Sequence, residues 1–249
     1  MNLRSLTYQE DGLRLRIALY SVRGVRARFS YSNTPTLSNT GTPHVFAELE
    51  PGVTFEFMTY NGTVPGPPLR VRVGDWIDMT LINPSSSRAE HSIDFHAASG
   101  PGGGAASLRA DPGESARTVW KAIYPGMFIY HCASGWISDH IAKGMYGAII
   151  VEDEEGFPYS DMDVFLGFEE LYLKYPLNNN FMTGFQKPEP NIHNVYDAVK
   201  ERYELSDVVM FNGAPFALVH SPIRTRVGSV VRAFIVSESA LDVVRTFSL

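Results

Sequence analysis

The sequence has only one cysteine among its 249 residues, so an internal disulfide is excluded. It also lacks long apolar stretches, and a run such as 147–151 is far shorter than the ~20 residues that cross a membrane. It has no excess of basic residues, because its net charge is −6, and this argues against a nucleic-acid partner. The residues are 44% hydrophobic and 12% aromatic, which is enough for the core of one large or two ordinary domains.

The single cysteine lies beside a histidine, within a group of side chains that bind transition metals. Neighbouring side chains on a strand point to opposite faces. His91 and His96 are five residues apart, and His131 and Cys132 are adjacent, so each pair is expected to diverge. The pattern predicts two metal sites, the first formed by His91, Cys132, His140 and Met145 and the second by His96 and His131.

The first set combines two imidazoles, a thiolate and a thioether. These are the ligands of a blue-copper electron-transfer centre with a weak axial methionine. Cys132, His140 and Met145 follow one another in a closing loop, Cys-x7-His-x4-Met, and His91 comes from a separate strand. We therefore expect a type 1 copper at this position. A buried cysteine is otherwise a small apolar residue, and the flanking ligands favour the metal instead.

The second set contains imidazole ligands only, which suits a catalytic copper with an open position. Asp94 has the same parity as His96, so its carboxylate is expected to face this site and to relay protons. The alternative is a strand carboxylate paired with an arginine. His44, His193 and His220 are the remaining histidines, and none lies in a comparable pattern; surface or loop positions are expected for all three.

The backbone pattern predicts an all-β fold. Short alternating or apolar segments are separated by turns rich in glycine and proline, and such spacing is typical of a β-sandwich; the segments are 53–58, 69–73, 76–82, 118–120 and 127–130. Residues 195–203 give the best helix candidate.

An internal repeat predicts two copies of one domain. Tyr60-Asn61-Gly62 returns as Phe211-Asn212-Gly213 at an offset of 151 residues. The segment 69–74 returns as 223–228 at an offset of 154. The ligands lie 17 to 71 residues after Gly74, whereas 21 residues follow Gly228. We therefore expect a complete first domain at 43–155 and a partial second copy at 156–249.

Residues 1–42 differ in composition from the rest of the chain. They contain six arginines, no lysine and two acids. Two alternatives account for this segment: an arginine-rich transit peptide, which would indicate a mitochondrial protein, or an N-terminal strand pair, since residues 13–19 alternate in part.

These motifs resemble the copper-containing nitrite reductases, two-domain cupredoxin proteins of the multicopper oxidase superfamily that form homotrimers. The resemblance spans about 44–237 and rests on four segments, 60–67, 91–98, 130–133 and 140–147. It implies a cupredoxin-like Greek-key β-sandwich. By this resemblance, nitrite is reduced to nitric oxide at the type 2 copper, and Asp94 matches the family's proton-relay aspartate. It also implies an electron donor such as a cupredoxin or a c-type cytochrome, and a periplasmic location.

The resemblance also implies a ligand that is missing from these motifs. In the family, the third type 2 ligand comes from the second domain of a neighbouring subunit, and the corresponding position, near Phe247 and Ser248, carries no histidine. The type 2 site is therefore expected to be incomplete. Three functions are weighed: a nitrite reductase, a type 1 electron carrier without catalysis, and an oxygen-reducing oxidase resembling laccases. The last is weakest, because Ala133 follows Cys132 and the sequence has no His-x-His.

Overall fold

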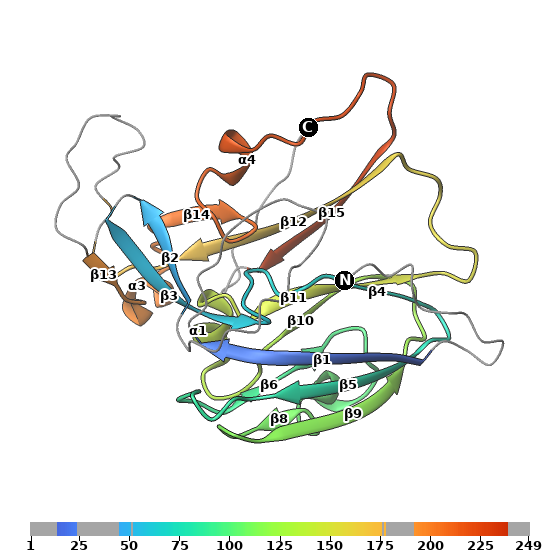
Figure 1. Ribbon diagram of the computed structural model, residues 1–249, viewed down its shortest axis with the longest axis horizontal. Coiled ribbons are helices and arrows are strands. Elements are labelled where there is room, and N and C mark those ends of the chain that lie inside the picture. The colour runs from blue at the N-terminus through green and yellow to red at the C-terminus, as the bar shows by residue number, and fades with distance from the viewer. Residues whose placement is uncertain (1–13, 24–44, 51, 176, 178–191, 239–249) are drawn as a thin grey trace.

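The computed structural model describes residues 14–23, 45–50, 52–175, 177 and 192–238 (Figure 1). The described chain consists mostly of strands with a few short helices, as the sequence predicts. No helix in these ranges is both long and apolar enough to span a membrane.

The first layer is a six-stranded sheet with the order β13-β3-β1-β5-β9, to which β2 adds by pairing with β3. Its strands are β1 (Arg14–Arg23), β2 (Val45–Glu50), β3 (Val53–Tyr60), β5 (Trp76–Ile82), β9 (Ser115–Lys121) and β13 (Ile192–Asn194). The alternation in β5 places Ile77, Met79 and Leu81 in the core with no exposed surface.

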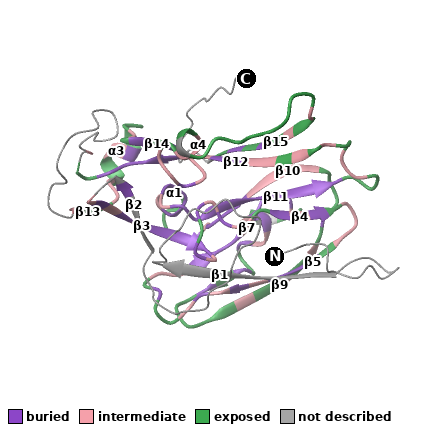
Figure 2. Ribbon diagram, turned by 45° about the horizontal axis from the view of Figure 1, so that its top comes forward, coloured by how far each residue is buried: buried purple, intermediate pink, exposed green. Residues whose placement is uncertain are grey.

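The second layer is a four-stranded sheet in the order β4-β11-β10-β7. It contains β4 (Leu69–Arg72), β7 (Asp94–Phe95), β10 (Gly126–His131) and β11 (Tyr146–Glu152). β11 is buried along its whole length, which fits its continuous apolar sequence (Figure 2). The core between the layers joins Ile77 and Met79 of β5 to Tyr130 of β10 and Ile149 of β11. This sandwich positions the predicted ligands.

A short two-stranded sheet completes the first half. It pairs β6 (His91–Ser92) with β8 (Arg109–Ala110), and His91 lies opposite Ala110. Between β7 and β8 the chain forms a 3-10 turn, Pro101–Gly104.

The second half forms a three-stranded sheet of β14 (Val208–Phe211), β12 (Met162–Leu171) and β15 (Val231–Glu238). β12 runs antiparallel to β14 and parallel to β15, as β1 runs antiparallel to β3 and parallel to β5. Asn61 and Asn212, the asparagines of the repeat, both have a φ of 53°. The sequence repeat is thus also a repeat of topology and of turn conformation.

The two halves share a second apolar cluster. It contains Phe55 and Phe57 of β3, Tyr146 of β11, and Leu171 and Met210 from the three-stranded sheet. In Figure 1 the three-stranded sheet lies on the far side of β10 and β11 from β5 and β9. β13 of the second half also pairs with β3 of the first. The segment proposed as the junction, between Glu152 and Met162, contains no helix or strand.

The helices of the structure differ from the sequence expectations in three ways. The helix expected at 195–203 is only α3 (Ala198–Arg202), because the Asp197 side chain accepts hydrogen bonds from the backbone of Val199 and Lys200 and so caps the helix there. A second helix, α1 (Ile137–Ala142), was not predicted, and it bears His140. A four-residue helix, α4 (Ala217–His220), follows β14.

Part of the arginine-rich N-terminal segment is described. Residues 14–23 form one strand, β1, between β3 and β5, which is one member of the strand pair expected under the second alternative. The rest of the segment lies outside the described residues.

Candidate metal centres

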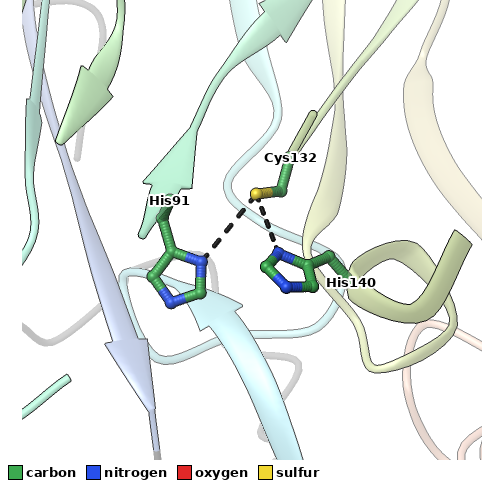
Figure 3. A group of neighbouring side chains, drawn as sticks. All are labelled: His91, Cys132 and His140. Carbon is green, nitrogen blue, oxygen red and sulfur yellow. Dashed lines mark hydrogen bonds between the residues drawn. The ribbon is translucent and has the colours of Figure 1, made fainter. Parts of the chain in front are cut away.

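The first group of side chains brings together His91, Cys132 and His140 (Figure 3). His91 comes from β6, Cys132 directly follows β10, and His140 lies on α1. Nδ1 of His140 is 3.1 Å and Nδ1 of His91 is 3.8 Å from the Cys132 Sγ. All three residues are buried, with 7% or less of their surface exposed.

These distances fit a shared metal ion. A thiolate lies about 2.3 Å and an imidazole nitrogen about 2.0–2.1 Å from zinc, so a sulfur and a nitrogen on one tetrahedral ion are about 3.5 Å apart. The two observed sulfur-to-nitrogen distances lie on either side of this value. Nitrogen and sulfur donors of this kind suit copper.

Met145, the fourth member of the predicted set, is fully buried in the same apolar cluster as Cys132. Its backbone N–H donates to the His140 carbonyl at 3.0 Å, and its carbonyl accepts from the Cys132 N–H at 3.1 Å. The loop between α1 and β11 is thereby tied to both ligands. That the Met145 thioether is the axial ligand of a type 1 copper stays a prediction.

Burial sets the protonation of the first group. It lowers the pKa of His140, so this imidazole is neutral near pH 7 and keeps a lone pair for a metal. Burial raises the pKa of the Cys132 thiol, although N–H donors of Ser134 and Ser92 oppose the rise. Without a metal the thiol stays protonated, and metal binding releases that proton.

The second group brings together Asp94, His96 and His131. Nε2 of His96 and Nε2 of His131 are 3.1 Å apart, and two imidazoles on one ion are separated by about 2.9–3.4 Å if each bond is about 2.0–2.1 Å. His131 Nδ1 lies 3.0 Å from the Cys132 carbonyl oxygen, which can only accept a hydrogen bond. Nδ1 therefore carries the proton, and Nε2 presents its lone pair to the site.

Solvent reaches the second group. His96 is exposed and Asp94 is partly exposed, whereas His131 is buried, which lowers its pKa. Asp94 lies opposite His131 in the pairing of β7 with β10. The second group therefore has one side in contact with solvent, unlike the first.

Gly103 supports the Asp94 side of this group. Its φ is +50°, and a side chain on it would overlap the Asp94 carboxylate and lie 2.6 Å from the Phe95 nitrogen. Only glycine lets this turn pass so close to β7.

The two groups meet at one peptide bond, because His131 belongs to the second and its neighbour Cys132 to the first. The parity of the sequence predicted this separation, and the structure groups the side chains in the same way. Metal binding by either group stays a prediction.

Comparison with known proteins gives consistent results. Residues 45–156 match the family described as multicopper oxidase. The chain is 37% identical over 188 residues to the copper-containing nitrite reductase of Neisseria meningitidis serogroup B, covering 75% of this chain and 45% of that protein. It is 36% identical over 203 residues to the copper-containing nitrite reductase of Pseudomonas chlororaphis, covering 77% and 54% respectively. The chain is similar to copper-containing nitrite reductases over about three quarters of its length. It spans about half the length of these relatives.

A solved member of the family has the same fold. The copper nitrite reductase from Nitrosomonas europaea superposes with a TM-score of 0.67 and 28% identity, covering 90% of this chain and 68% of that one. The likeness confirms the prediction of an all-β, cupredoxin-like fold.

Of the remaining histidines, only His193 is fully described. It is exposed on β13, and its Nδ1 lies 3.2 Å from the Thr54 hydroxyl, away from both groups as expected. His44 and the side chain of His220 lie outside the described part.

Sequence reasoning missed the polar residues around the Cys132 sulfur. Ser92 and Ser134 are both buried beside it, and Tyr60 donates a hydrogen bond to the Ser92 carbonyl. Their positions, one residue after His91 and two after Cys132, were the available signal.

Proposed function

We propose that this chain takes part in the copper-dependent reduction of nitrite to nitric oxide. The observation that carries the proposal is the presence of two ligand groups of different chemistry on either side of the His131–Cys132 peptide bond. One group contains a buried cysteine thiol and the other contains imidazoles and a carboxylate that reaches solvent. This combination suits an electron-entry site joined to a substrate site.

In this proposal the first group, with Met145, holds a type 1 copper, and His96 and His131 hold a type 2 copper. Copper in these groups would supply one-electron redox chemistry and a position for nitrite. The donor sets support the assignment, because a cysteine with two histidines and a methionine is the blue-copper ligand set, while the all-imidazole pair leaves positions open.

The residues of the chain would contribute orientation and protons. Burial excludes water from Cys132, and the His131-to-Cys132 hydrogen bond fixes the ring of His131. Conversion of nitrite to nitric oxide and water consumes an electron and two protons, so a proton donor is needed beside the substrate. Asp94 is placed for this role, since it belongs to the second group and reaches solvent.

The direct test is nitric oxide release. Copper-loaded protein is given nitrite and an artificial electron donor, and nitric oxide is measured with an electrode. The proposal expects turnover that depends on His96 and His131. Turnover that survives His96→Ala and His131→Ala together would contradict it.

A second candidate is electron transfer without catalysis. It is favoured by one observation: among the described residues, only two imidazoles converge on the second group. Under this alternative, the type 1 spectra are present and nitrite turnover is absent. If the family's third type 2 ligand is supplied by another subunit, turnover requires association of chains, and a homotrimer is proposed for that case.

The proposal also covers the protein that donates the electron and the cellular compartment in which the chain works. A small redox protein such as a cupredoxin or a c-type cytochrome would deliver the electron. We propose the periplasm over the mitochondrion, because residues 14–23 are paired in the sheet and the relatives named above are bacterial.

A further inference from the structure

We infer that Ser92 and Ser134 form a polar cradle that positions the Cys132 sulfur and raises the reduction potential of the metal bound there. The inference rests on the proposed function, since it concerns the first metal group. Neither serine is a ligand, and both act through the cysteine.

Ser92 links the strand of His91 to the loop of Cys132. Its backbone nitrogen donates to the Cys132 sulfur at 3.5 Å, and its hydroxyl oxygen lies 4.0 Å from the same atom. The hydroxyl oxygen also accepts from the Ala133 N–H at 2.9 Å. That bond leaves the hydroxyl proton free to point at the sulfur. Ser92 thus contacts the cysteine sulfur and also binds the backbone of the next residue, Ala133.

Ser92 itself is held rigidly. Its carbonyl accepts a 2.6 Å hydrogen bond from the hydroxyl of Tyr60, and Ser92, Tyr60 and Cys132 all have no exposed surface. Burial raises the pKa of Tyr60 well above its usual value, so the phenol remains a donor. The contact between Ser92 and the sulfur is therefore preorganised and dry.

Ser134 gives independent support. It is 1% exposed, and its hydroxyl oxygen makes no hydrogen bond of ordinary geometry within the described chain. A buried hydroxyl without a partner costs free energy, so it needs an explanation. Its backbone N–H and its hydroxyl both counteract the rise in the pKa of Cys132, which places the hydroxyl beside the sulfur. A negatively charged sulfur, present only when a metal is bound, would give this hydroxyl an acceptor.

The consequence for a bound copper follows from charge. Hydrogen bonds to a ligating thiolate withdraw electron density from the sulfur, and hydrogen bonding around the cysteine sulfur is known to tune the potential of blue-copper sites. Less donation from the sulfur favours the reduced metal, which raises the potential. Reduction adds one electron at the site and removes no proton from either serine.

The test is the reduction potential of copper-loaded protein, measured by a spectroscopic redox titration of the thiolate-to-copper band. Ser92→Ala and Ser134→Ala remove the hydroxyls with almost no change of shape. Each variant should have a lower potential than the wild type and a shifted band, and the double variant should have the lowest potential. Ser87→Ala is the matched control, because Ser87 is also buried but its hydroxyl donates to the Ala89 carbonyl at 3.1 Å.

The outcomes separate the cradle from a purely structural role. If Ser92→Ala and Ser134→Ala lower the thermal midpoint like Ser87→Ala but leave the potential unchanged, the serines only pack and the inference is overturned. A potential shift in a protein that does not reduce nitrite supports the cradle and rejects the proposed catalysis. A copper-loaded wild type without a thiolate band overturns both the type 1 assignment and the cradle.

Discussion

At the scale of single residues, the two groups differ most in their access to water. Cys132 has no exposed surface, whereas His96 is exposed and Asp94 is partly so. Electron transfer does not require contact between solvent and the metal, but consumption of protons requires a path from water. The buried group is thus the one proposed for electron transfer, and the group that reaches solvent is the one proposed for nitrite reduction.

Replacement of Asp94 by asparagine tests its role as proton donor. Asn keeps the shape but cannot release a proton, so nitrite turnover should fall by about 10²-fold, a typical value for the loss of a general acid. The thiolate-to-copper band should stay unchanged, because the side chain belongs to the other group. Steady-state nitric oxide release and the visible spectrum measure the two effects. Turnover equal to that of the wild type would remove Asp94 from the mechanism.

At the scale of elements, the turn Pro101–Gly104 supports β7, which carries Asp94. Gly102 and Gly103 both have positive φ, at 58° and 50°. An added Cβ at Gly102 meets only the Ala105 side chain at 3.8 Å, whereas one at Gly103 overlaps Asp94 and the backbone of Phe95.

This contrast gives a matched pair of variants. Gly102→Ala and Gly103→Ala each add backbone strain of about 1–2 kcal/mol. Only Gly103→Ala must also displace Asp94, so it should lose nitrite turnover and considerably more stability. Urea unfolding and nitric oxide release measure both quantities. Equal effects of the two substitutions would show that the close approach does not position Asp94.

The elements also show what sequence reasoning can and cannot predict. The ligand grouping agrees with the parity of the sequence. The structure reaches it differently, because His91 lies on β6 and Asp94 on β7 of another sheet, while His96 and Cys132 lie just beyond the ends of strands. The helix that contains His140, α1, could not be predicted. It has only six residues with little apolar periodicity, so its helical state depends on packing against the rest of the protein. The insertion of β1 between β3 and β5 depends on contacts distant in sequence, which periodicity does not encode.

At the scale of the whole molecule, the two repeat copies bury equivalent positions differently. Leu81 of β5 has no exposed surface, while Ile235, its equivalent on β15 at the offset of 154 residues, is 37% exposed. Val231 is likewise 40% exposed, whereas its equivalent, Ile77, is fully buried. The outer face of the three-stranded sheet therefore carries apolar residues at positions that are buried in the first copy. Within the described chain, no other element packs over these residues as the core packs over Ile77 and Leu81.

Aspartate at the equivalent positions tests this difference. Leu81→Asp places a charge in a closed core and should cost more than about 3 kcal/mol or prevent folding. Ile235→Asp places it on an open face and should change the free energy of unfolding by about 1 kcal/mol or less. Urea denaturation compares the two. A large loss for Ile235→Asp would mean that this face is covered in solution.

An ion-pair cluster joins the two halves. Arg70 on β4 lies 2.7 Å from Asp163 on β12, and Arg232 on β15 lies 3.5 Å from the same carboxylate. Partial burial alone would raise the pKa of Asp163. Hydrogen bonds from Ser160 and Arg70 and the two positive charges outweigh it, so the pKa is lowered.

The lowered pKa fixes the direction of a pH effect. The ion pairs of Asp163 stabilise the folded state at pH values above about 3.9, the pKa of an aspartate in the unfolded chain. This stabilisation is lost as the pH falls through the lower pKa that Asp163 has in the folded state. Asp163→Asn should therefore cost about 1 kcal/mol or less at pH 7, with a difference from the wild type that disappears once the pH falls below the lowered folded pKa. Asp153→Asn, at an exposed acid, is the control. A pH-independent difference in the unfolding free energy would contradict this assignment.

The central claim is that Cys132 and its partners form a type 1 copper site separate from the group at His96 and His131. The most direct measurement is the visible and electron paramagnetic resonance spectrum of copper-loaded wild type and Cys132→Ser, recorded with the copper content per chain. We expect an intense thiolate-to-copper band in the wild type that Cys132→Ser abolishes. Bound copper without this band in the wild type, or a band that survives Cys132→Ser, would contradict the account.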